Sequence, residues 1–328
     1  MARYRVYQID SFTRTKFEGN PAGVVSNADG LSDAQMQQIA RELNNSETAF
    51  IFNSARPDYD VEVRFFTPTN EVPLCGHATI AAHYVLAKEC AEGRCAHRLE
   101  APAKGRSTIT RQKTKAGILA VETTAINNDW RIRMFQGEPH FEQPFAPEIR
   151  AEILAALGLA EQDLRSDCPV AIASAGHSKV FIGITSRATL NALTPEWERL
   201  KKASALISCN GFYVFTLDEQ AEILVHGRMF APAIGILEDP VTGNANGPLG
   251  LYLVHHGLCA ALHDEASFEF SILQGEAIGR PGTMRVHVDI EKGEPVAVNI
   301  VGEAVEVLRT EIELPSPNES FVKAKCYE

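Results

Sequence analysis

Two short segments of this chain combine a Pro-x-x-Gly turn with side chains that can move protons. Residues 73–78 read Pro-Leu-Cys-Gly-His-Ala, and residues 240–245 read Pro-Val-Thr-Gly-Asn-Ala. His77 follows the first glycine, and Asp239 directly precedes the second segment. Imidazole and carboxylate groups act as general acids and bases in many enzymes. His77 could transfer a proton or orient a polar group of a substrate, and Asp239 could fix a substrate or only open a turn.

Glu47 is a third candidate for acid–base chemistry. It lies between a segment with amphipathic helical spacing and an apolar run of strand formers. A carboxylate that loses hydration at the wall of a cleft can accept a proton from one carbon and return it to another. The alternative interpretation is a solvated loop glutamate or a charge at the end of a helix.

Gly76 and Gly243 each stand between a strand pattern and a run that is apolar nearly all round. The first turn of a helix presents backbone N–H groups without internal partners, and the helix dipole adds partial positive charge there. Glycine lets a ligand approach this backbone closely. Two such helix starts predict a pocket for a small anion, most simply a carboxylate, although the glycines could also serve only as tight turns.

The two segments belong to a longer internal repeat, in which Gly243 follows Gly76 by 167 residues. Three pairs of segments match in the same order. They are Ala49-Phe50-Ile51-Phe52 with Phe212-Tyr213-Val214-Phe215, Arg64-Phe65-Phe66-Thr67-Pro68 with Arg228-Met229-Phe230-Ala231-Pro232, and residues 72–78 with residues 239–245. Three ordered matches indicate a duplicated domain with pseudo-twofold symmetry.

The elements around these segments repeat as well. Strands are expected over 4–9, 48–53 and 61–67 in the first half and over 178–184, 211–217 and 222–230 in the second. Helices are expected after Ser32, after Gly76, over 147–157, after Thr194 and from Gly243 to His256. An apolar helix must be enclosed by sheet to stay out of water. The pattern predicts an α+β protein with two pseudo-symmetric lobes, 1–125 and 126–328, each a mixed sheet wrapped around a central apolar helix. The strand-rich C-terminal segment is expected to pack back on the first lobe.

Composition excludes several other classes of protein. The 328 residues carry 31 Lys and Arg against 42 Asp and Glu, a net charge of −11. Binding to nucleic acid or to an anionic membrane requires cationic patches, so neither partner is expected. No apolar run approaches the length of a membrane span or a signal peptide, and we expect a cytoplasmic protein. Seven cysteines without a C-x-x-C pair predict neither a disulfide framework nor a metal site.

The chain resembles the PhzF family, whose fold is that of diaminopimelate epimerase, over nearly its whole length. The segments that carry the resemblance are Gly19-Asn20-Pro21-Ala22-Gly23-Val24-Val25, Asn45-Ser46-Glu47-Thr48-Ala49-Phe50, Arg64-Phe65-Phe66-Thr67-Pro68, Cys75-Gly76-His77-Ala78-Thr79 and Phe230-Ala231-Pro232. The stretch from Glu238 to Pro248 is most similar to the YddE-like branch, whose members are isomerases without an assigned substrate.

The resemblance implies catalytic roles for Glu47, His77 and Asp239. Glu47 matches the carboxylate that moves a proton between carbons of a small cyclic amino acid without a cofactor. The remaining positions of the implied substrate site are Ser46, Gly76, Thr242, Gly243 and Asn244. The chain departs from the family at Asn244, where PhzF has a serine. An amide cannot relay a proton as a hydroxyl does, which puts the phenazine-precursor substrate in doubt more than the isomerase chemistry.

Cys75 distinguishes two enzyme classes within this fold. Diaminopimelate epimerase and related racemases use two opposed thiols, one from each repeat. A helix N-terminus stabilises a thiolate, so Cys75 is well placed for that role. Its partner in the repeat is Thr242, whose hydroxyl is too weakly acidic to act alone as the second base. We therefore expect Cys75 to be a small packing residue behind the pocket.

These observations favour a cofactor-independent isomerase that acts on a small carboxylate-bearing metabolite, with Glu47 as the proton shuttle. The alternatives are an amino-acid epimerase or racemase that uses Glu47 or Cys75 with His77 or Asp239, and a catalytically idle small-molecule binding or interaction protein. Neither a cofactor nor a metal is expected. The family resemblance implies a homodimer.

Overall fold

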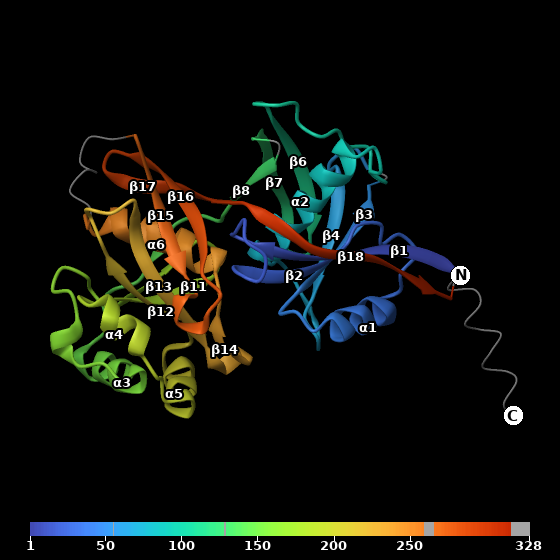
Figure 1. Cartoon of the computed structure of the whole chain (residues 1–328). Helices are drawn as coiled ribbons and strands as arrows, with labels where there is room; N and C mark the ends of the chain where they lie inside the picture. Colours follow the sequence, from blue (N-terminus) through green and yellow to red (C-terminus); the bar gives the residue numbers. More distant parts are fainter. Residues whose placement is uncertain (55, 128, 259–265, 316–328) are drawn as a thin grey trace, which may run out of the picture. The chain divides into compact units, whose positions relative to one another are not determined.

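The computed structural model describes residues 1–54, 56–127, 129–258 and 266–315 of the chain (Figure 1). They form two compact units. The first comprises Met1–Met134 and the described residues from 302 onward, and the second comprises Phe135–Val301. The sequence predicted lobes at 1–125 and 126–328, with the C-terminal segment packing back on the first lobe. None of the described helices is both long enough and apolar enough to cross a membrane.

The first unit is a mixed sheet with two helices. Its elements are β1 (Ala2–Ser11), β2 (Asn20–Val25), α1 (Asp33–Leu43), β3 (Thr48–Asn53), β4 (Val61–Phe66), β5 (Glu71–Val72), α2 (Gly76–Ala91), β6 (Ser107–Thr114), β7 (Gly117–Ile126), β8 (Asp129–Phe135) and β18 (Ala304–Leu314). Strands β1 and β18 pair antiparallel from Ala2 to Ser11, so the end of the chain completes the first unit. Two pairs are parallel, β2 with β3 and β4 with β6.

The second unit repeats this order. Its elements are β9 (His140–Phe141), α3 (Pro147–Leu157), β10 (Ala171–Ser174), β11 (Ser178–Gly183), α4 (Arg187–Ala192), α5 (Trp197–Ile207), β12 (Phe212–Leu217), β13 (Ile223–Ala231), β14 (Ile236–Asp239), α6 (Gly243–His255), β15 (Ser267–Gln274), β16 (Gly282–Glu291) and β17 (Glu294–Gly302), with short 3₁₀ turns at Glu161–Asp163, Pro232–Ile234 and Glu276–Ile278. Parallel pairs again join β11 with β12 and β13 with β15.

The strand registers refine the sequence alignment of the two repeats by one residue. Thr48 stands opposite Phe66 in the first unit, and Phe212 stands opposite Phe230 in the second. Thr48 is therefore the counterpart of Phe212, whereas the sequence match had paired Ala49 with it. Aromatic and small apolar residues occupy several positions of each strand. The sequence match alone therefore could not distinguish two alignments of the repeats that differ by one residue.

The helix boundaries confirm the expected start and stop signals. Ser32 accepts a hydrogen bond from the amide of Gln35, whose side chain reaches back to the Ser32 amide, so the predicted capping box is present. Pro147 opens α3, and Gly158 ends it with a left-handed φ of 74°. Helix α6 begins at Gly243 and ends at His255, as the sequence predicted to within one residue.

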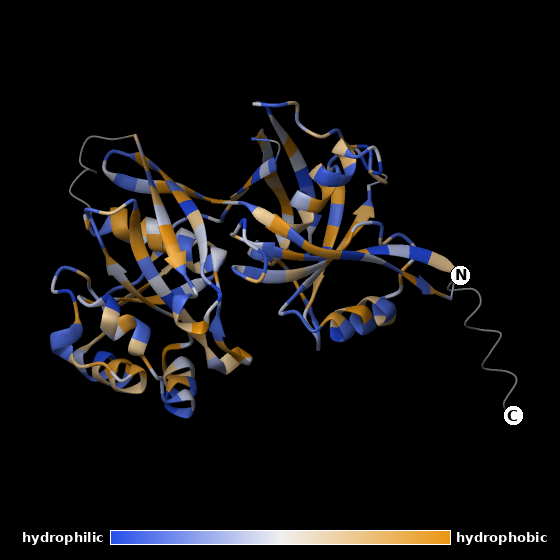
Figure 2. Ribbon diagram, viewed as in Figure 1, coloured by the Kyte–Doolittle hydropathy of each residue, from blue (hydrophilic) through white to orange (hydrophobic). Residues whose placement is uncertain are grey.

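Helices cover both faces of the first sheet. Met36, Ile39 and Ala40 of the amphipathic α1 pack with Phe50 and Phe66, whose side chains point to one face of β3 and β4. Figure 2 shows hydrophobic and hydrophilic residues together along α1. Successive strand residues point to opposite faces, so the intervening buried residues face α2.

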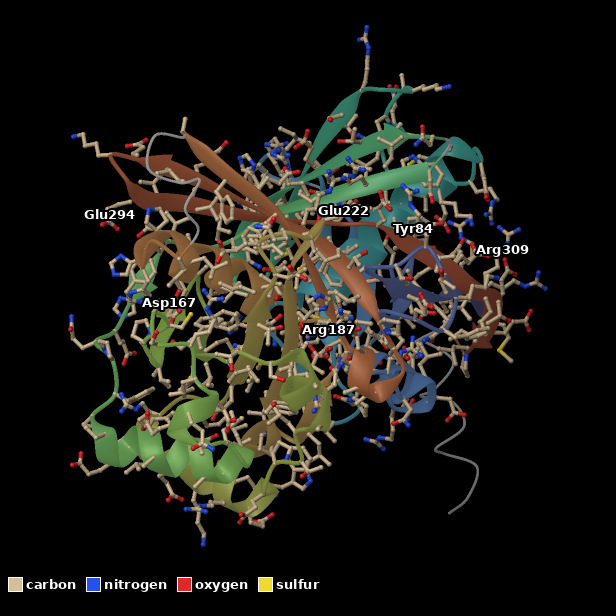
Figure 3. All side chains as sticks on the ribbon, turned by 60° about the vertical axis from the view of Figure 1, so that its left-hand side comes forward. Tyr84, Asp167, Arg187, Glu222, Glu294 and Arg309 are labelled. Carbon is tan, nitrogen blue, oxygen red and sulfur yellow. A yellow bond between two sulfur atoms is a disulfide. The ribbon has the colours of Figure 1, made fainter. Side chains whose placement is uncertain are left out.

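Helix α2 is buried along most of its length, as its all-round apolar pattern predicted. Tyr84, labelled in Figure 3, extends from this helix and meets Trp130 of β8 edge to face, with ring centroids 5.8 Å apart. Near the other end of α2, the fully buried Glu89 accepts hydrogen bonds from Tyr7 and Ser26. An additional bond from Arg5 supplies the positive charge that a buried carboxylate needs.

The second sheet is covered in the same way. Helices α3, α4 and α5 gather on one side of it (Figure 1), over a core that includes Phe212, Val214 and Phe230. Helix α6 covers the opposite face, where Tyr252 packs against Phe181 and Phe215. In each unit, one apolar helix therefore lies on the face opposite the other helices.

An arginine–glutamate pair ties the strands that lead into each apolar helix. Arg64 binds both carboxylate oxygens of Glu71, at 2.8 and 2.7 Å. In the second unit, Arg228 binds both oxygens of Glu238, at 2.9 and 2.7 Å, and the two side chains are only 7% and 9% exposed. Each glutamate stands five residues before the glycine that begins the helix. The pair therefore holds the turn that sets where the helix starts.

The cysteines correct one expectation from the sequence. Cys90 and Cys95 form a disulfide with their Cα atoms 4.4 Å apart, which the cysteine spacing did not predict. Cys75, Cys168 and Cys209 are buried and do not take part in a disulfide among the described residues. Cys259 and Cys326 lie outside the described residues.

We predict that Glu238→Ala lowers the free energy of unfolding by about 3 kcal/mol or more, because it leaves the buried Arg228 guanidinium without its counter-ion. Denaturant unfolding measures the change. The matched control is Glu198→Ala, which removes an exposed partner of Lys201 and is expected to change stability by at most about 0.5 kcal/mol. Equal effects of the two substitutions would contradict this role of the pair.

We predict that His83 makes the fold sensitive to acid. Burial lowers the pKa of His83 from 6.5 to about 4, and its Nε2 lies 2.8 Å from Gln112 Oε1. Below pH 6.5 the unfolded chain binds a proton that the folded chain does not, so stability falls until about pH 4, by about 3 kcal/mol in all. Unfolding of the wild type and of His83→Gln across this range should show the difference, and the exposed control His140→Gln should behave as wild type.

Candidate active site

The loop that carries Glu47 is held at both ends. Helix α1 ends at Asn44, which adopts the left-handed conformation with φ of 52°. The side-chain amides of Asn45 and Gln8 then bind each other reciprocally, at 2.8 and 2.9 Å. The amide of Gly23 donates to the carbonyl of Glu47 at 3.2 Å. These contacts leave the Glu47 side chain 15% exposed at the start of β3.

Glu47 and His77 lie within reach of proton transfer. His77 Nε2 is 3.4 Å from Glu47 Oε2 and 3.2 Å from Ser46 Oγ. On the other side of the ring, Nδ1 is 3.4 Å from Cys75 Sγ. The backbone of His77 is held as well, because Ser11 Oγ donates to its carbonyl at 2.8 Å. The structure thus brings together four residues that the sequence singled out, from the loop before β3 and the start of α2.

This cluster contains the donor types of a metal site. Glu47, Cys75 and His77 each place one potential ligand atom within 4.8 Å of the others. Nε2 of His77 lies 3.4 Å from Glu47 Oε2 and 4.0 Å from Cys75 Sγ, so one imidazole nitrogen is near both partners. The cluster has the geometry of a hydrogen-bonded acid–base pair, and its three donor atoms are also close enough together to share an ion.

The start of α2 forms the floor of this half-site. Cys75 occupies the N-cap position, and its side chain makes no capping hydrogen bond. Its carbonyl accepts bonds from the amide and hydroxyl of Thr79, at 3.0 and 2.7 Å. The amides that begin at Gly76 therefore lack a side-chain cap and remain suited to an anion.

The second half-site is a hydrogen-bonded network around the start of α6. Thr242 Oγ1 donates to Asp239 Oδ2 at 2.5 Å. Gln274, at the end of β15, donates to the Asp239 carbonyl at 2.8 Å and to Thr242 Oγ1 at 3.0 Å, and it accepts from the Thr242 amide at 3.1 Å. Gln274 is 1% exposed, so these bonds are shielded from water.

Two further polar residues extend the network into α6. Asn246 is fully buried and donates to Gln274 Oε1 at 2.9 Å and to the Thr242 carbonyl at 3.1 Å. Its oxygen accepts a bond from Tyr213. Asn244 differs from these residues, because its Oδ1 is buried without a partner among the described residues. An acceptor of this kind can receive an N–H or O–H from a bound molecule.

The sequence prediction missed Gln274, Asn246, Tyr213 and Gln136. Gln136 donates to the carbonyl of Gly243 at 2.9 Å. Gln274 and Gln136 lie outside the quoted motifs, while Tyr213 and Asn246 lie within quoted segments that gave them no role. Asn246 alone offered a signal, since it lies three residues after Gly243, where Thr79 follows Gly76.

We predict that Gln274→Leu destabilises the second unit by about 2 kcal/mol, because it leaves several buried donors and acceptors without partners. Denaturant unfolding tests this, with the exposed Gln220→Leu as a control that should leave stability nearly unchanged. If Gln274→Leu unfolds at the wild-type midpoint, the network does not hold the helix start.

Known proteins share this sequence and arrangement. The family profile described as phenazine biosynthesis-like protein matches residues 9–310. An uncharacterized isomerase of Clostridium acetobutylicum is 54% identical, over 95% of this chain and 99% of its own length. The uncharacterized isomerase YddE of Salmonella typhimurium is 47% identical, over 94% and 97%. A trans-2,3-dihydro-3-hydroxyanthranilate isomerase of Pseudomonas chlororaphis is 33% identical, over 90% and 95%.

Solved structures show the same fold. The chain matches a phenazine biosynthesis protein of the PhzF family from Bacillus anthracis with a TM-score of 0.81 and 30% identity, over 96% of this chain and all of that one. A hydroxyproline epimerase from Agrobacterium vitis matches with a TM-score of 0.60 and 10% identity, over 97% and 93%. The second likeness concerns the fold alone, and it agrees with the predicted epimerase-like α+β architecture.

Proposed function

The chain belongs to the phenazine biosynthesis-like (PhzF) family of isomerases, and we propose that it moves a proton on a small carboxylate-bearing metabolite with Glu47 as the shuttle. The contact between Glu47 and His77 carries the proposal. Glu47 Oε2 lies 3.4 Å from an imidazole nitrogen, and the carboxylate keeps a limited opening to solvent.

The reaction needs no net oxidation or reduction. Glu47 takes a proton from one carbon of the substrate, the electron pair of the broken C–H bond shifts the adjacent double bond, and the proton returns to a different carbon. His77 donates a hydrogen bond to the Glu47 carboxylate or to a polar substrate group. Ser46, 3.2 Å from His77 Nε2, helps to orient the ring.

The substrate carboxylate is proposed to bind at the start of α2, beside Glu47, and the start of α6 has the same uncapped geometry. Gly76 and Gly243 each begin a buried helix of more than three turns, and no N-cap side chain competes for the first amides of either helix. Thr242 and Asp239 form the polar wall of the second half-site. Asn244, which stands where the family has serine, has an oxygen without a partner among the described residues, and this oxygen can accept from a donor on a molecule bound at the start of α6.

The substrate class follows from the relative with a named reaction. A cyclic, unsaturated amino acid such as trans-2,3-dihydro-3-hydroxyanthranilate contains a carboxylate and a carbon acid for Glu47. At 33% identity that enzyme supports the class of reaction, and the serine-to-Asn244 difference favours a different member of the class. The homodimer and the cytoplasmic location remain predictions.

A thiol-based racemase is the second candidate, because Cys75 Sγ contacts His77 Nδ1 at 3.4 Å. Its counterpart in the repeat is Thr242, whose hydroxyl already donates to Asp239. The second unit therefore offers no thiol at the matching position, and the contact is better explained by packing behind the imidazole.

We predict that Glu47→Gln lowers the rate of proton transfer by about 10⁴-fold, equivalent to about 5 kcal/mol of barrier, because an amide keeps the shape but carries no proton. The assay is deuterium incorporation from D₂O, followed by NMR over a mixture of small unsaturated carboxylates. Glu42→Gln, at an exposed position of α1, is the matched control and should retain wild-type activity.

Cys75→Ala is expected to cost much less activity than Glu47→Gln. An inactive Cys75→Ala beside an active Glu47→Gln would replace the proton-shuttle proposal with the thiol-based one. If a ligand stabilises the wild type against unfolding but no deuterium is incorporated into that ligand, the chain is a binding protein.

A further inference from the structure

The duplicated architecture identifies the position in the second unit that corresponds to Glu47. In the first unit, Asn44 ends α1 in the left-handed conformation with φ of 52°, and Glu47 follows three residues later. In the second unit, Ser208 ends α5 with φ of 53°, and Gly211 follows three residues later. Both positions directly precede the matching strands β3 and β12. Gly211 is therefore the counterpart of Glu47.

The strands next to these positions, β2 and β11, also carry different residue types at matching places. Strand β2 donates a backbone N–H to the carbonyl of Glu47, and β11 donates the equivalent bond to Gly211. The residue before the donor is Ala22 in β2 and Lys179 in β11. A small residue and an ionisable residue have thus exchanged places between the two repeats.

Lys179 fills the space that Gly211 leaves. A Cβ at Gly211 would lie 2.3 Å from Lys179 Cδ, so the lysine chain runs directly across the glycine. Along the same sheet face, Tyr213 stands opposite Met229, and Met229 stands opposite Asp239. Tyr213 binds Asn246 of α6, so this is the face that α6 covers. Lys179 therefore extends over the sheet on the side of the second half-site.

The Lys179 ammonium is poorly satisfied for a buried charge. The residue is 8% exposed, and among the described residues Nζ donates a single hydrogen bond, to the Ser178 carbonyl at 3.1 Å. It interacts electrostatically with Asp239 and with Cys209, and burial lowers the pKa of Lys179 to about 8. An ammonium has three N–H donors, so a buried one with spare donors is suited to an external acceptor.

We propose that Lys179 makes the start of α6 a binding site for carboxylates, in which its ammonium offsets the Asp239 charge and donates to the bound carboxylate within the second unit. The inference rests on the proposed function. Without Lys179, the Asp239 carboxylate would repel another carboxylate from the start of α6. With it, the half-site is close to neutral and keeps the positive end of the helix dipole.

Isothermal titration with acetate, benzoate, anthranilate and succinate tests the proposal on the full chain. Lys179→Met retains the length of the side chain and removes the charge, and it should weaken carboxylate binding by about tenfold or more. Lys202→Met, at an exposed position of α5, is the matched control and should bind as wild type. Circular dichroism and thermal unfolding verify that each variant is folded.

Two further variants separate charge balance from general damage. The double variant Lys179→Met/Asp239→Asn should recover part of the lost affinity, because the repelling charge is gone as well. Gly211→Ala changes no charge but displaces the lysine chain, and it should weaken binding in the same direction. The proposal is wrong if the wild type binds none of the four carboxylates, if Lys179→Met binds as tightly as wild type, or if the double variant binds no better than the single one.

The catalytic proposal fails separately. Glu47→Gln should retain carboxylate binding while it loses deuterium exchange, and Lys179→Met should lose carboxylate binding. Loss of binding in Glu47→Gln alone would count against the shuttle and leave the role of Lys179 intact.

Discussion

The structure depends on the enclosure of one apolar helix in each unit. Helices α2 and α6 have no polar face, so each must be shielded from water by a sheet. The sides of each helix are buried, so the backbone amides that can still bind other groups are those at its N-terminus. Polar residues gather there in both units, Glu47 and His77 at α2 and Asp239 and Thr242 at α6.

The arginine–glutamate pairs fix the position at which each apolar helix begins. Arg64 with Glu71, and Arg228 with Glu238, join the strands that precede the two helices. Arg228 also donates to the carbonyls of Leu190 and Leu193 at the end of α4, so the pair holds the end of that helix as well. A buried pair of this kind is specific rather than strongly stabilising, because desolvation offsets much of the attraction.

Duplication explains how one scaffold holds two unlike half-sites. The backbone positions of Glu47 and Gly211 correspond, yet one unit presents a carboxylate and the other an ammonium that reaches across from the adjacent strand. His77 likewise corresponds to Asn244. The strand registers keep the matching backbone positions equivalent in the two units. The residues at those positions differ, and so does the charge that each unit presents.

The sequence by itself determined the elements and much of the first half-site. Periodicity, the Ser32 capping box and the glycine motifs predicted the helices, because these signals act between residues close in the chain. Glu47, His77 and Cys75 were recognised from local motifs, and the structure brings them together. Only the tertiary structure decided the roles of Gln274 and Lys179. Their positions depend on strand registers between distant segments, and a one-residue slip would move each side chain to the other face of its sheet.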